Sequence, residues 1–411
     1  MLADRLSLRV NFSWTLVGNS VYSASQWGLI VVMAKLGSPE LVGLYSLALA
    51  VTTPVFMFTF LGLSNIQATD VQAKNTFGDY LGLRLLCSLL GIVFIAGILG
   101  VAGYKGDVAI IIALVSLSKL LESISDVSYG LMQKQERLDL IARSLMLRGI
   151  LSLVVITASL SYFHSLAVAL AMQVIVWGGL MWFYDLPNVR RWQQTSPRFD
   201  FRTLINLLWL ALPLGIVAGL NSLSTQVPRY SLERIGGQRE LGIFSAIAAI
   251  GAVGNLITYA LSRSALPRLS HLYAQGRIYR FIRLLLQLMG MGAFVGALGI
   301  MGAVFWGKPF LSLVYTAEYA TYTDVLLITM VSIAVSAVFT FVGTAVTATQ
   351  QFAVQALIHI IKVTSIGIAC FVLVPQWRSL GAAWAVLIGS LVSCFMFSFM
   401  LWMTLKKAEI R

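Results

Sequence analysis

The segment Leu114–Gly130 reads LVSLSKLLESISDVSYG and places three ionisable side chains, Lys119, Glu122 and Asp126, inside an otherwise apolar stretch. At about 100° per residue, these three positions lie within roughly 60° of one another on a helix. If this helix crosses a membrane, each ionised side chain facing lipid would cost about 2.5–3.5 kcal/mol on insertion scales. The stripe therefore has to face protein or water, which predicts a membrane bundle with a polar interior.

The composition of the whole chain agrees with a membrane location. Of 411 residues, 58% are hydrophobic and 11% are charged, whereas soluble domains carry about 25% charged residues. Since a bilayer is crossed by about 20 apolar residues, the sequence predicts an all-α integral membrane protein with about twelve transmembrane helices. The segments are 12–34, 42–64, 85–103, 108–130, 145–163, 165–185, 204–225, 242–264, 284–306, 322–347, 356–374 and 381–403.

The net charge of +13 follows the predicted topology. When lysines and arginines are assigned to alternate sides of the twelve segments, the side with both termini collects 21, the other side collects 7, and Lys119 stays within the membrane. Cytoplasmic loops are the ones rich in lysine and arginine. We therefore expect both termini in the cytoplasm and no nucleic-acid partner. The short basic N-terminus reads as an uncleaved anchor.

A weak internal repeat divides the chain near its middle. The stretch ELVGLYSLALA at 40–50 aligns with RELGIFSAIAA at 239–249, an offset of 199 residues. The basic segment 186–201 is the natural joint, so we predict two six-helix lobes, residues 1–195 and 196–411, around a central cavity. Repeats of six spans run parallel to each other, and substrates of such proteins commonly bind between the halves, near the midplane of the bilayer.

The stripe from 116 to 137 has two interpretations. In the first, Lys119 and Glu122, one turn apart, neutralise each other and tie the helix to its neighbours. In the second, Lys119 and Ser123 line a hydrated cavity, and Glu122 or Asp126 binds the coupling cation. A carboxylate in a partly dry cavity is a suitable place for a proton or a cation, because its charged form is disfavoured there.

Other polar residues in apolar segments are candidates for substrate contacts. Amide and aromatic side chains that can bind sugars or join helices share one face of the first segment: Asn19, Tyr22 and Gln26. Four cationic side chains lie near the predicted cytoplasmic ends of segments: Arg84, Arg148, Arg263 and Lys362. Such side chains either extend to the lipid headgroups or attract an anionic substrate. The tenth segment carries a hydroxyl-rich stripe over 329–347, which suits either close helix packing or a neutral cavity wall.

The sequence offers little for catalysis. It contains no phosphate-binding glycine loop, no HExxH motif and no Cys/His spacing typical of a metal site. Only the predicted outward loops at 226–241 and 307–321 exceed a few residues, and both are too short for a catalytic module. We therefore expect a transporter without cofactor or bound metal.

Three stretches resemble the polysaccharide-exporter family of oligosaccharide-lipid flippases, the Wzx-type proteins: MAKLGSPELVGLYSLALA (33–50), LVYTAEYATYTDVLLI (313–328) and LVPQWRSLGAAWAVLIGS (373–390). The superfamily also contains multidrug antiporters. The resemblance implies two six-helix lobes that alternate access to a central cavity. It also implies transfer of a polyprenyl-pyrophosphate-linked glycan to the outer leaflet of the bacterial inner membrane, next to polysaccharide polymerase or export machinery. Two departures are Tyr315–Thr316 in place of an aromatic–Gly step, and Arg378 where a glycine is common.

Two rival functions stay open at this stage. The first is a multidrug or organic-cation antiporter, which would use Glu122 and Asp126 as its carboxylates; a net positive cavity would favour the flippase, and a net negative one the antiporter. The second is a membrane enzyme such as a glycan polymerase, ligase or glycosyltransferase, which the short outward loops disfavour. The sugar composition and the coupling ion, Na⁺ or H⁺, do not follow from the sequence.

Overall fold

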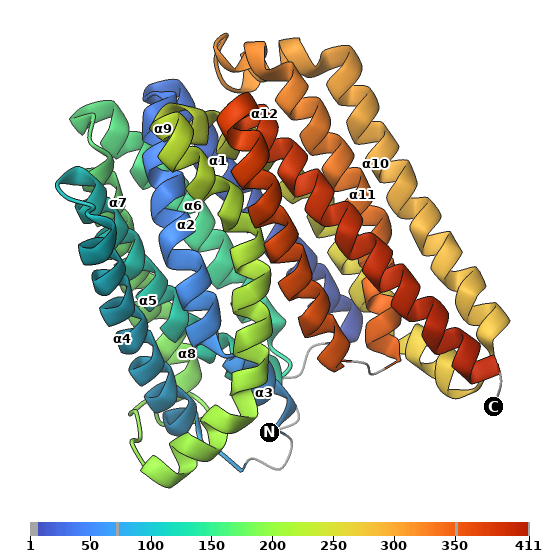
Figure 1. The fold of residues 1–411 in the computed structure, drawn as a ribbon. Coiled ribbons are helices and arrows are strands. Elements are labelled where there is room, and N and C mark those ends of the chain that lie inside the picture. The colour runs from blue at the N-terminus through green and yellow to red at the C-terminus, as the bar shows by residue number, and fades with distance from the viewer. Residues whose placement is uncertain (1–6, 71–73, 350–351, 410–411) are drawn as a thin grey trace. The chain divides into compact units, whose positions relative to one another are not determined.

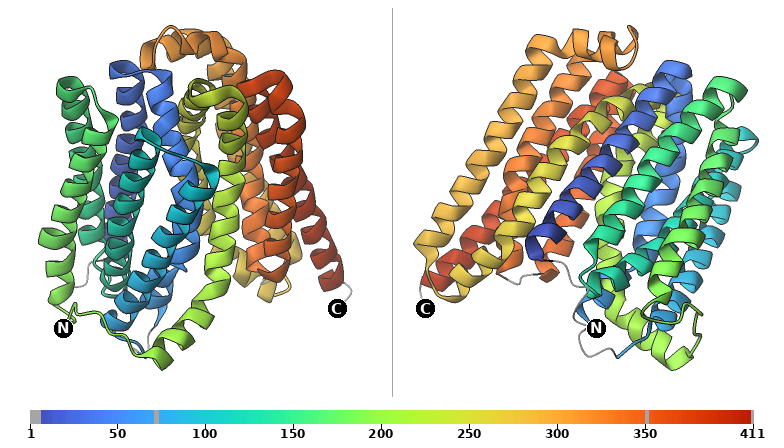
Figure 2. Two further views of the ribbon diagram at one scale, coloured as in Figure 1. Left: turned by 60° about the vertical axis from the view of Figure 1, so that its left-hand side comes forward. Right: turned by 180° about the vertical axis from the view of Figure 1, so that it is seen from behind.

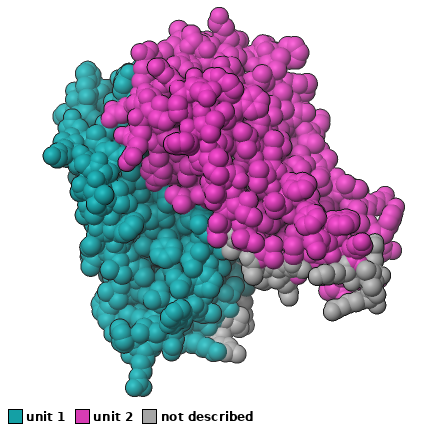
Figure 3. Space-filling model, in the orientation of Figure 1, with its two compact units in different colours: residues 1–222 teal, residues 223–411 magenta. Residues whose placement is uncertain are grey.

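The computed structural model describes residues 7–70, 74–349 and 352–409, and within these ranges the chain is helical and contains no strand (Figure 1). The chain forms two compact units, unit 1 with residues 1–222 and unit 2 with residues 223–411 (Figure 3). The predicted lobe boundary at 195–196 lies before helix α9 (Phe201–Ala274), whereas the division between the two compact units lies within α9, after Ser222. The lobe boundary stays a prediction.

Unit 1 consists of α1 (Leu8–Leu36), α2 (Pro39–Phe60), α3 (Leu63–Thr69), α4 (Phe77–Ala102), α5 (Asp107–Lys134), α6 (Leu138–Phe163), α7 (Leu166–Leu180), the π-helix η1 (Met181–Asp185), α8 (Leu186–Arg190) and the first part of α9 (Phe201–Ala274). Unit 2 consists of the rest of α9, then α10 (Ile278–Val314), the 3₁₀-helix η2 (Tyr319–Tyr322), α11 (Thr323–Ala348) and α12 (Phe352–Glu409). Within unit 2, α10 and α11 lie side by side in both views of Figure 2.

Nine helical stretches of the described residues are long and apolar enough to cross a membrane. Two of them, Phe201–Gly251 and Leu357–Lys406, have 51 and 50 residues and each contains a reversal of the chain. The first reversal is at Gly237 (φ 73°) and the second at Arg378 (φ 45°). Helix α1 is not among the nine, because Asn19, Tyr22, Gln26 and several serines dilute its apolar character. With α1 and the two reversals included, every predicted segment overlaps a helix, although segment 42–64 crosses the turn at Leu61 and Gly62 between α2 and α3.

The predicted loops at 226–241 and 307–321 are largely wrong. Helix α9 continues as helix to its reversal at Gly237, and α10 continues to Val314. Residues 226–236 are polar enough to leave the bilayer yet remain helical, and Arg229 donates a 2.6 Å hydrogen bond to Gln226 one turn away. Hydropathy locates the edge of the lipid, whereas a helix ends where its backbone hydrogen bonds end.

Local sequence signals set the helix starts in unit 1. Helix α2 begins with Pro39 after Ser38, whose hydroxyl accepts from the Leu41 amide; proline at the first position and serine at the N-cap are both favourable. Helix α4 begins with a capping box, in which the Thr76 amide and hydroxyl both donate to Asp79 at 2.7 Å. These caps fix where α2 and α4 enter the bundle.

A core cluster in unit 1 joins α4, α5 and α8. It includes Phe77, Tyr80, Val127, Leu131 and Val189, all at most 1% exposed. Close packing of such side chains supports the association of these helices. The cluster therefore joins those ends of the helices that are predicted to face the cytoplasm.

Candidate functional site

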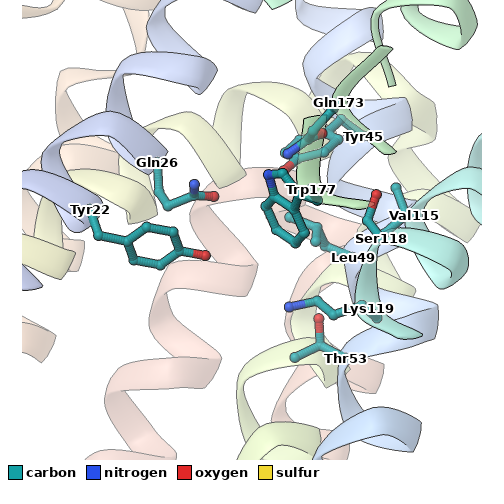
Figure 4. A pocket seen from close by; sticks show the side chains of 10 residues that line it. All are labelled: Tyr22, Gln26, Tyr45, Leu49, Thr53, Val115, Ser118, Lys119, Gln173 and Trp177. Carbon is teal, nitrogen blue, oxygen red and sulfur yellow. The ribbon is translucent and has the colours of Figure 1, made fainter. Parts of the chain in front are cut away.

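Unit 1 encloses a cavity of about 230 Å³ between four of its helices (Figure 4). Its ten lining residues recur at helical spacing, so each helix offers one face: Tyr22 and Gln26 from α1, Tyr45, Leu49 and Thr53 from α2, Val115, Ser118 and Lys119 from α5, Gln173 and Trp177 from α7. A mixture of aromatic rings and a few convergent polar groups is typical of a ligand pocket. We call this cavity the unit 1 pocket.

Lys119 is the only charged residue among the ten that line the unit 1 pocket. Its ammonium group donates a 2.8 Å hydrogen bond to Oε2 of Glu122, one turn further along α5. The two side chains are 15% and 22% exposed, so solvent screens them only in part. The ammonium group of Lys119 thus lines the pocket, whereas the carboxylate of Glu122 that pairs with it lies just outside the lining.

Gln26 presents a hydrogen-bond donor that no described residue uses. Its Nε2 atom is buried and has no hydrogen-bond partner in the described part of the chain, and in Figure 4 the side chain extends from α1 with its amide oxygen, rather than Nε2, on the side of Trp177. Leaving such a donor unpaired costs about 1–3 kcal/mol. A hydroxyl group or water in the pocket would satisfy this amide.

Trp177 forms a fixed aromatic wall of the pocket. Its indole N–H donates a 2.7 Å hydrogen bond to Ser152 on α6, and the Arg148 guanidinium lies 4.7 Å from the ring centroid. A cation over the face of a tryptophan is attracted to the ring. The ring is therefore held in one orientation by two groups of α6.

Arg148 belongs to a buried polar network beneath Trp177. Arg148 is 1% exposed; it donates to Ser125 at 2.6 Å and lies 3.6 Å from Asp185, which is fully buried. Asp185 also accepts hydrogen bonds of 2.7 Å from Ser125 and from Ser144. Asp185 ends the π-helix η1, and the wider turn of a π-helix rotates the residues that follow it. This local geometry brings Asp185 to face α5 and α6.

The polar stripe of α5 lines the unit 1 pocket at Lys119 but not further along the helix, at Ser123 and Asp126. Asp126 forms a 2.5 Å ion pair with Arg84 of α4, which is 0% exposed and lies 4.6 Å from the ring centroid of Phe60. Ser123 is fully buried and accepts a 3.0 Å hydrogen bond from Ser88 of α4. These residues connect helices of unit 1 and are absent from the pocket lining.

The other predicted site residues lie in various places. Tyr22, Gln26 and Lys119 line the unit 1 pocket, whereas Asn19 donates to the Thr15 carbonyl at 2.7 Å and Arg148 lies behind Trp177. Lys362 is partly buried on α12 of unit 2. The side chain of Arg263 lies outside the described residues. The functional roles of all these residues stay predictions.

Sequence reasoning missed Gln173 and Trp177. They lie four residues apart within the apolar segment 165–185, a spacing that places both on one face of a helix. This shared face is a signal that could have identified the two residues. Uncharged side chains, however, add little to the free energy of membrane insertion, so they do not stand out as ionised ones do.

The hydroxyl stripe of α11 contacts α12 through its serines, whereas its threonines bond within α11. Ser336 donates a 3.2 Å hydrogen bond to Ser390 of α12, and Ser332 lies 3.5 Å from the same hydroxyl. Thr340, Thr344 and Thr347 donate to carbonyls of their own helix. Within the described residues, no group of three or more His, Cys, Asp or Glu side chains could hold a metal ion.

Comparison with known proteins gives a consistent result. Residues 8–273 match the family described as polysaccharide biosynthesis protein. The chain is 31% identical over 391 residues to the capsular polysaccharide biosynthesis protein CapF of Staphylococcus aureus, covering 93% of this chain and 96% of CapF.

Two solved structures have a similar fold. The lipid II flippase MurJ in an inward closed conformation has a TM-score of 0.76 at 12% identity, covering 94% of this chain and 87% of MurJ. An inward-facing multidrug resistance MATE transporter of the MOP superfamily has a TM-score of 0.71 at 13% identity, covering 96% of this chain and 99% of that transporter.

Proposed function

Because the chain belongs to the polysaccharide biosynthesis protein family, we propose that it is a flippase for a polyprenyl-pyrophosphate-linked oligosaccharide. The substrate is the repeat unit of an O-antigen, capsule or exopolysaccharide, moved from the cytoplasmic to the outer leaflet of the bacterial inner membrane. The protein makes or breaks no covalent bond of the substrate. Its termini lie in the cytoplasm, and the glycan polymerase or export machinery receives the product.

The unit 1 pocket is the observation that carries this proposal. It combines a lysine ammonium, an unpaired buried amide at Gln26 and the fixed ring of Trp177. Sugars offer hydroxyl groups for the amides and an apolar ring face for the tryptophan, and the pyrophosphate is a partner for a cation. Sugars and pyrophosphate cannot cross hydrocarbon unaided. A polar pocket supports their passage while the lipid tail stays in the bilayer.

The charge of the pocket disfavours the drug antiporter. Of the two carboxylates that such an antiporter would use, Glu122 is bound to Lys119 and Asp126 to Arg84. The lining itself carries the lysine and no carboxylate. Neither carboxylate is therefore free to bind a cationic drug, whereas the Lys119 ammonium can bind an anionic headgroup once Glu122 is neutralised.

Deletion of the gene tests the proposed function. We expect the lipid-linked oligosaccharide to accumulate in the cytoplasmic leaflet and the surface polysaccharide to be lost, because the polar headgroup cannot cross hydrocarbon unaided. The measurements are lipid extraction with mass spectrometry and staining of the surface glycan, with a plasmid-borne copy as control. Normal glycan display together with new sensitivity to cationic drugs would support the antiporter instead.

We further propose that a proton or Na⁺ at Glu122 couples transport to the ion gradient. Neutralising Glu122 weakens its bond to Lys119, and the released ammonium can then hold the anionic headgroup. Coupling follows if the two ligands favour different arrangements of the protein, since only differential binding shifts such an equilibrium.

Glu122→Gln and Asp126→Asn distinguish the two candidate carboxylates. We expect Glu122→Gln to transport at a rate that no longer responds to the ion gradient, because the glutamine mimics the neutralised state. Asp126→Asn should retain the gradient response and lower the amount of folded protein, because Arg84 loses its partner. Flipping in vesicles with imposed pH or Na⁺ gradients measures both. A gradient response that is lost in Asp126→Asn and kept in Glu122→Gln would place coupling at Asp126.

A further inference from the structure

The segment that connects α8 to α9 is basic and exposed. We call residues 190–202 the basic strap; its four arginines, Arg190, Arg191, Arg198 and Arg202, are all exposed. None of the four forms an ion pair with a carboxylate of the described residues. Asp200 is the one acidic residue, and hydrogen bonds from Thr203 hold its pKa below the ordinary value. The strap thus has a net charge of +3 from four arginines and one aspartate.

The strap is held in place by α4 although it contains little regular structure. The Gln193 side chain accepts a 2.6 Å hydrogen bond from the Phe77 amide, and the Arg198 amide donates at 2.9 Å to the Gly78 carbonyl. Gly82 lies so close that a Cβ there would be 2.0 Å from the Arg198 carbonyl oxygen. Because folding already orders this backbone, a ligand would not have to supply that ordering free energy.

Aromatic side chains flank the arginines. Phe199 and Phe201 are 58% and 74% exposed, and Trp182 and Phe183 of η1 are 58% and 81% exposed. Phe199 and Phe201 lie at the start of the candidate span Phe201–Gly251, and Trp182 and Phe183 lie in the last part of the candidate span Leu166–Arg190. Aromatic residues next to cations at the ends of spans are typical of the membrane interface, where the rings lie among the headgroups.

We propose that the basic strap is a binding site for anionic phospholipid headgroups of the adjacent leaflet. The exposed guanidinium groups can bind phosphate in pairs of hydrogen bonds, and the aromatic rings set the depth of the strap in the interface. Clusters of arginine beside a membrane span attract anionic lipid. This site shares no residue with the unit 1 pocket and does not depend on the proposed function.

Native mass spectrometry of the purified protein with phosphatidylglycerol or phosphatidylcholine tests the site. The strap variant replaces the four strap arginines with glutamine. The control variant makes the same change at four exposed arginines of unit 2: Arg268, Arg277, Arg280 and Arg283. Each arginine near an anionic surface contributes a factor of about five in affinity. We therefore expect the strap variant to bind phosphatidylglycerol at least about tenfold more weakly than the control variant does, with phosphatidylcholine binding unchanged.

A second measurement keeps the test valid if the strap variant does not fold. In the unaltered protein, hydrogen exchange over 190–202 should slow in nanodiscs that contain phosphatidylglycerol and not in pure phosphatidylcholine. The variant Phe199→Ser/Phe201→Ser keeps every charge and should reduce this protection. Equal losses of lipid in the strap and control variants would show an effect of net charge alone and overturn the proposal. Unchanged lipid binding in the strap variant would mean that its arginines act only as a topology signal.

Discussion

Arg148→Met is expected to lower the melting temperature and the amount of folded protein in the membrane. The substitution leaves Asp185 buried at 0% exposure without its cation, and it removes the guanidinium that donates to Ser125 and covers Trp177. Breaking a buried ion pair from one side costs about 3–5 kcal/mol, out of a total stability of about 5–15 kcal/mol. Membrane abundance and the melting temperature in detergent measure the loss.

The double variant Arg148→Met/Asp185→Leu is the matched control for this prediction. It removes both charges and keeps the approximate volume, and buried pairs replaced in this way are often nearly neutral in stability. We expect it to recover at least half of the lost melting temperature. A single Arg148→Met variant as stable as the unaltered protein would show that the network contributes nothing to the fold.

Lys119→Gln/Glu122→Gln is expected to reduce export of the glycan by about tenfold to a hundredfold, because a hydrogen bond to a charged group contributes about 1.5–3 kcal/mol. The pair is replaced together so that neither charge is left alone in the bundle. Surface glycan per molecule of transporter, in a strain that lacks the chromosomal gene, is the measurement.

Two controls make the Lys119 result specific. Lys119→Arg keeps the charge and should retain most of the export. Ser118→Ala changes a neighbouring lining residue whose hydroxyl bonds to the Leu114 carbonyl of its own helix, and it should have little effect. Full export by the doubly neutral variant would mean that the ammonium does not contact the substrate.

The helical architecture could be predicted from the sequence, because an apolar segment of about 20 residues has few other solutions in a membrane. The polar stripe at Lys119, Glu122 and Asp126 also lies on a helix, α5, as its period predicted. The period gives the angle of a side chain around the helix, but it does not give the neighbours at each height. Lys119 therefore lines the unit 1 pocket, whereas Asp126, two turns away on the same face, forms an ion pair with Arg84 of α4.

The buried network was beyond prediction for a different reason. Asp185 is the last residue of a predicted segment and, on a regular helix, would be assigned to the membrane boundary. The π-helix η1 changes its direction, and its partner Arg148 lies on another helix. Such pairs depend on a local irregularity of the backbone and on tertiary packing, neither of which leaves a periodic signal in the sequence. The role of Trp177 was missed for the same reason, because the orientation of its ring depends on Arg148 and Ser152 of α6.

The most direct test of the central claim is a flipping assay with purified protein in liposomes. A fluorescent polyprenyl-pyrophosphate oligosaccharide is incorporated into both leaflets, and its accessibility to an added membrane-impermeant glycosidase is followed over time. We predict that the unaltered protein makes the protected pool accessible, that Lys119→Arg retains this activity and that Lys119→Gln/Glu122→Gln loses most of it. Liposomes in which the protected pool stays protected, while an organic cation is moved across the same membrane, would contradict the account.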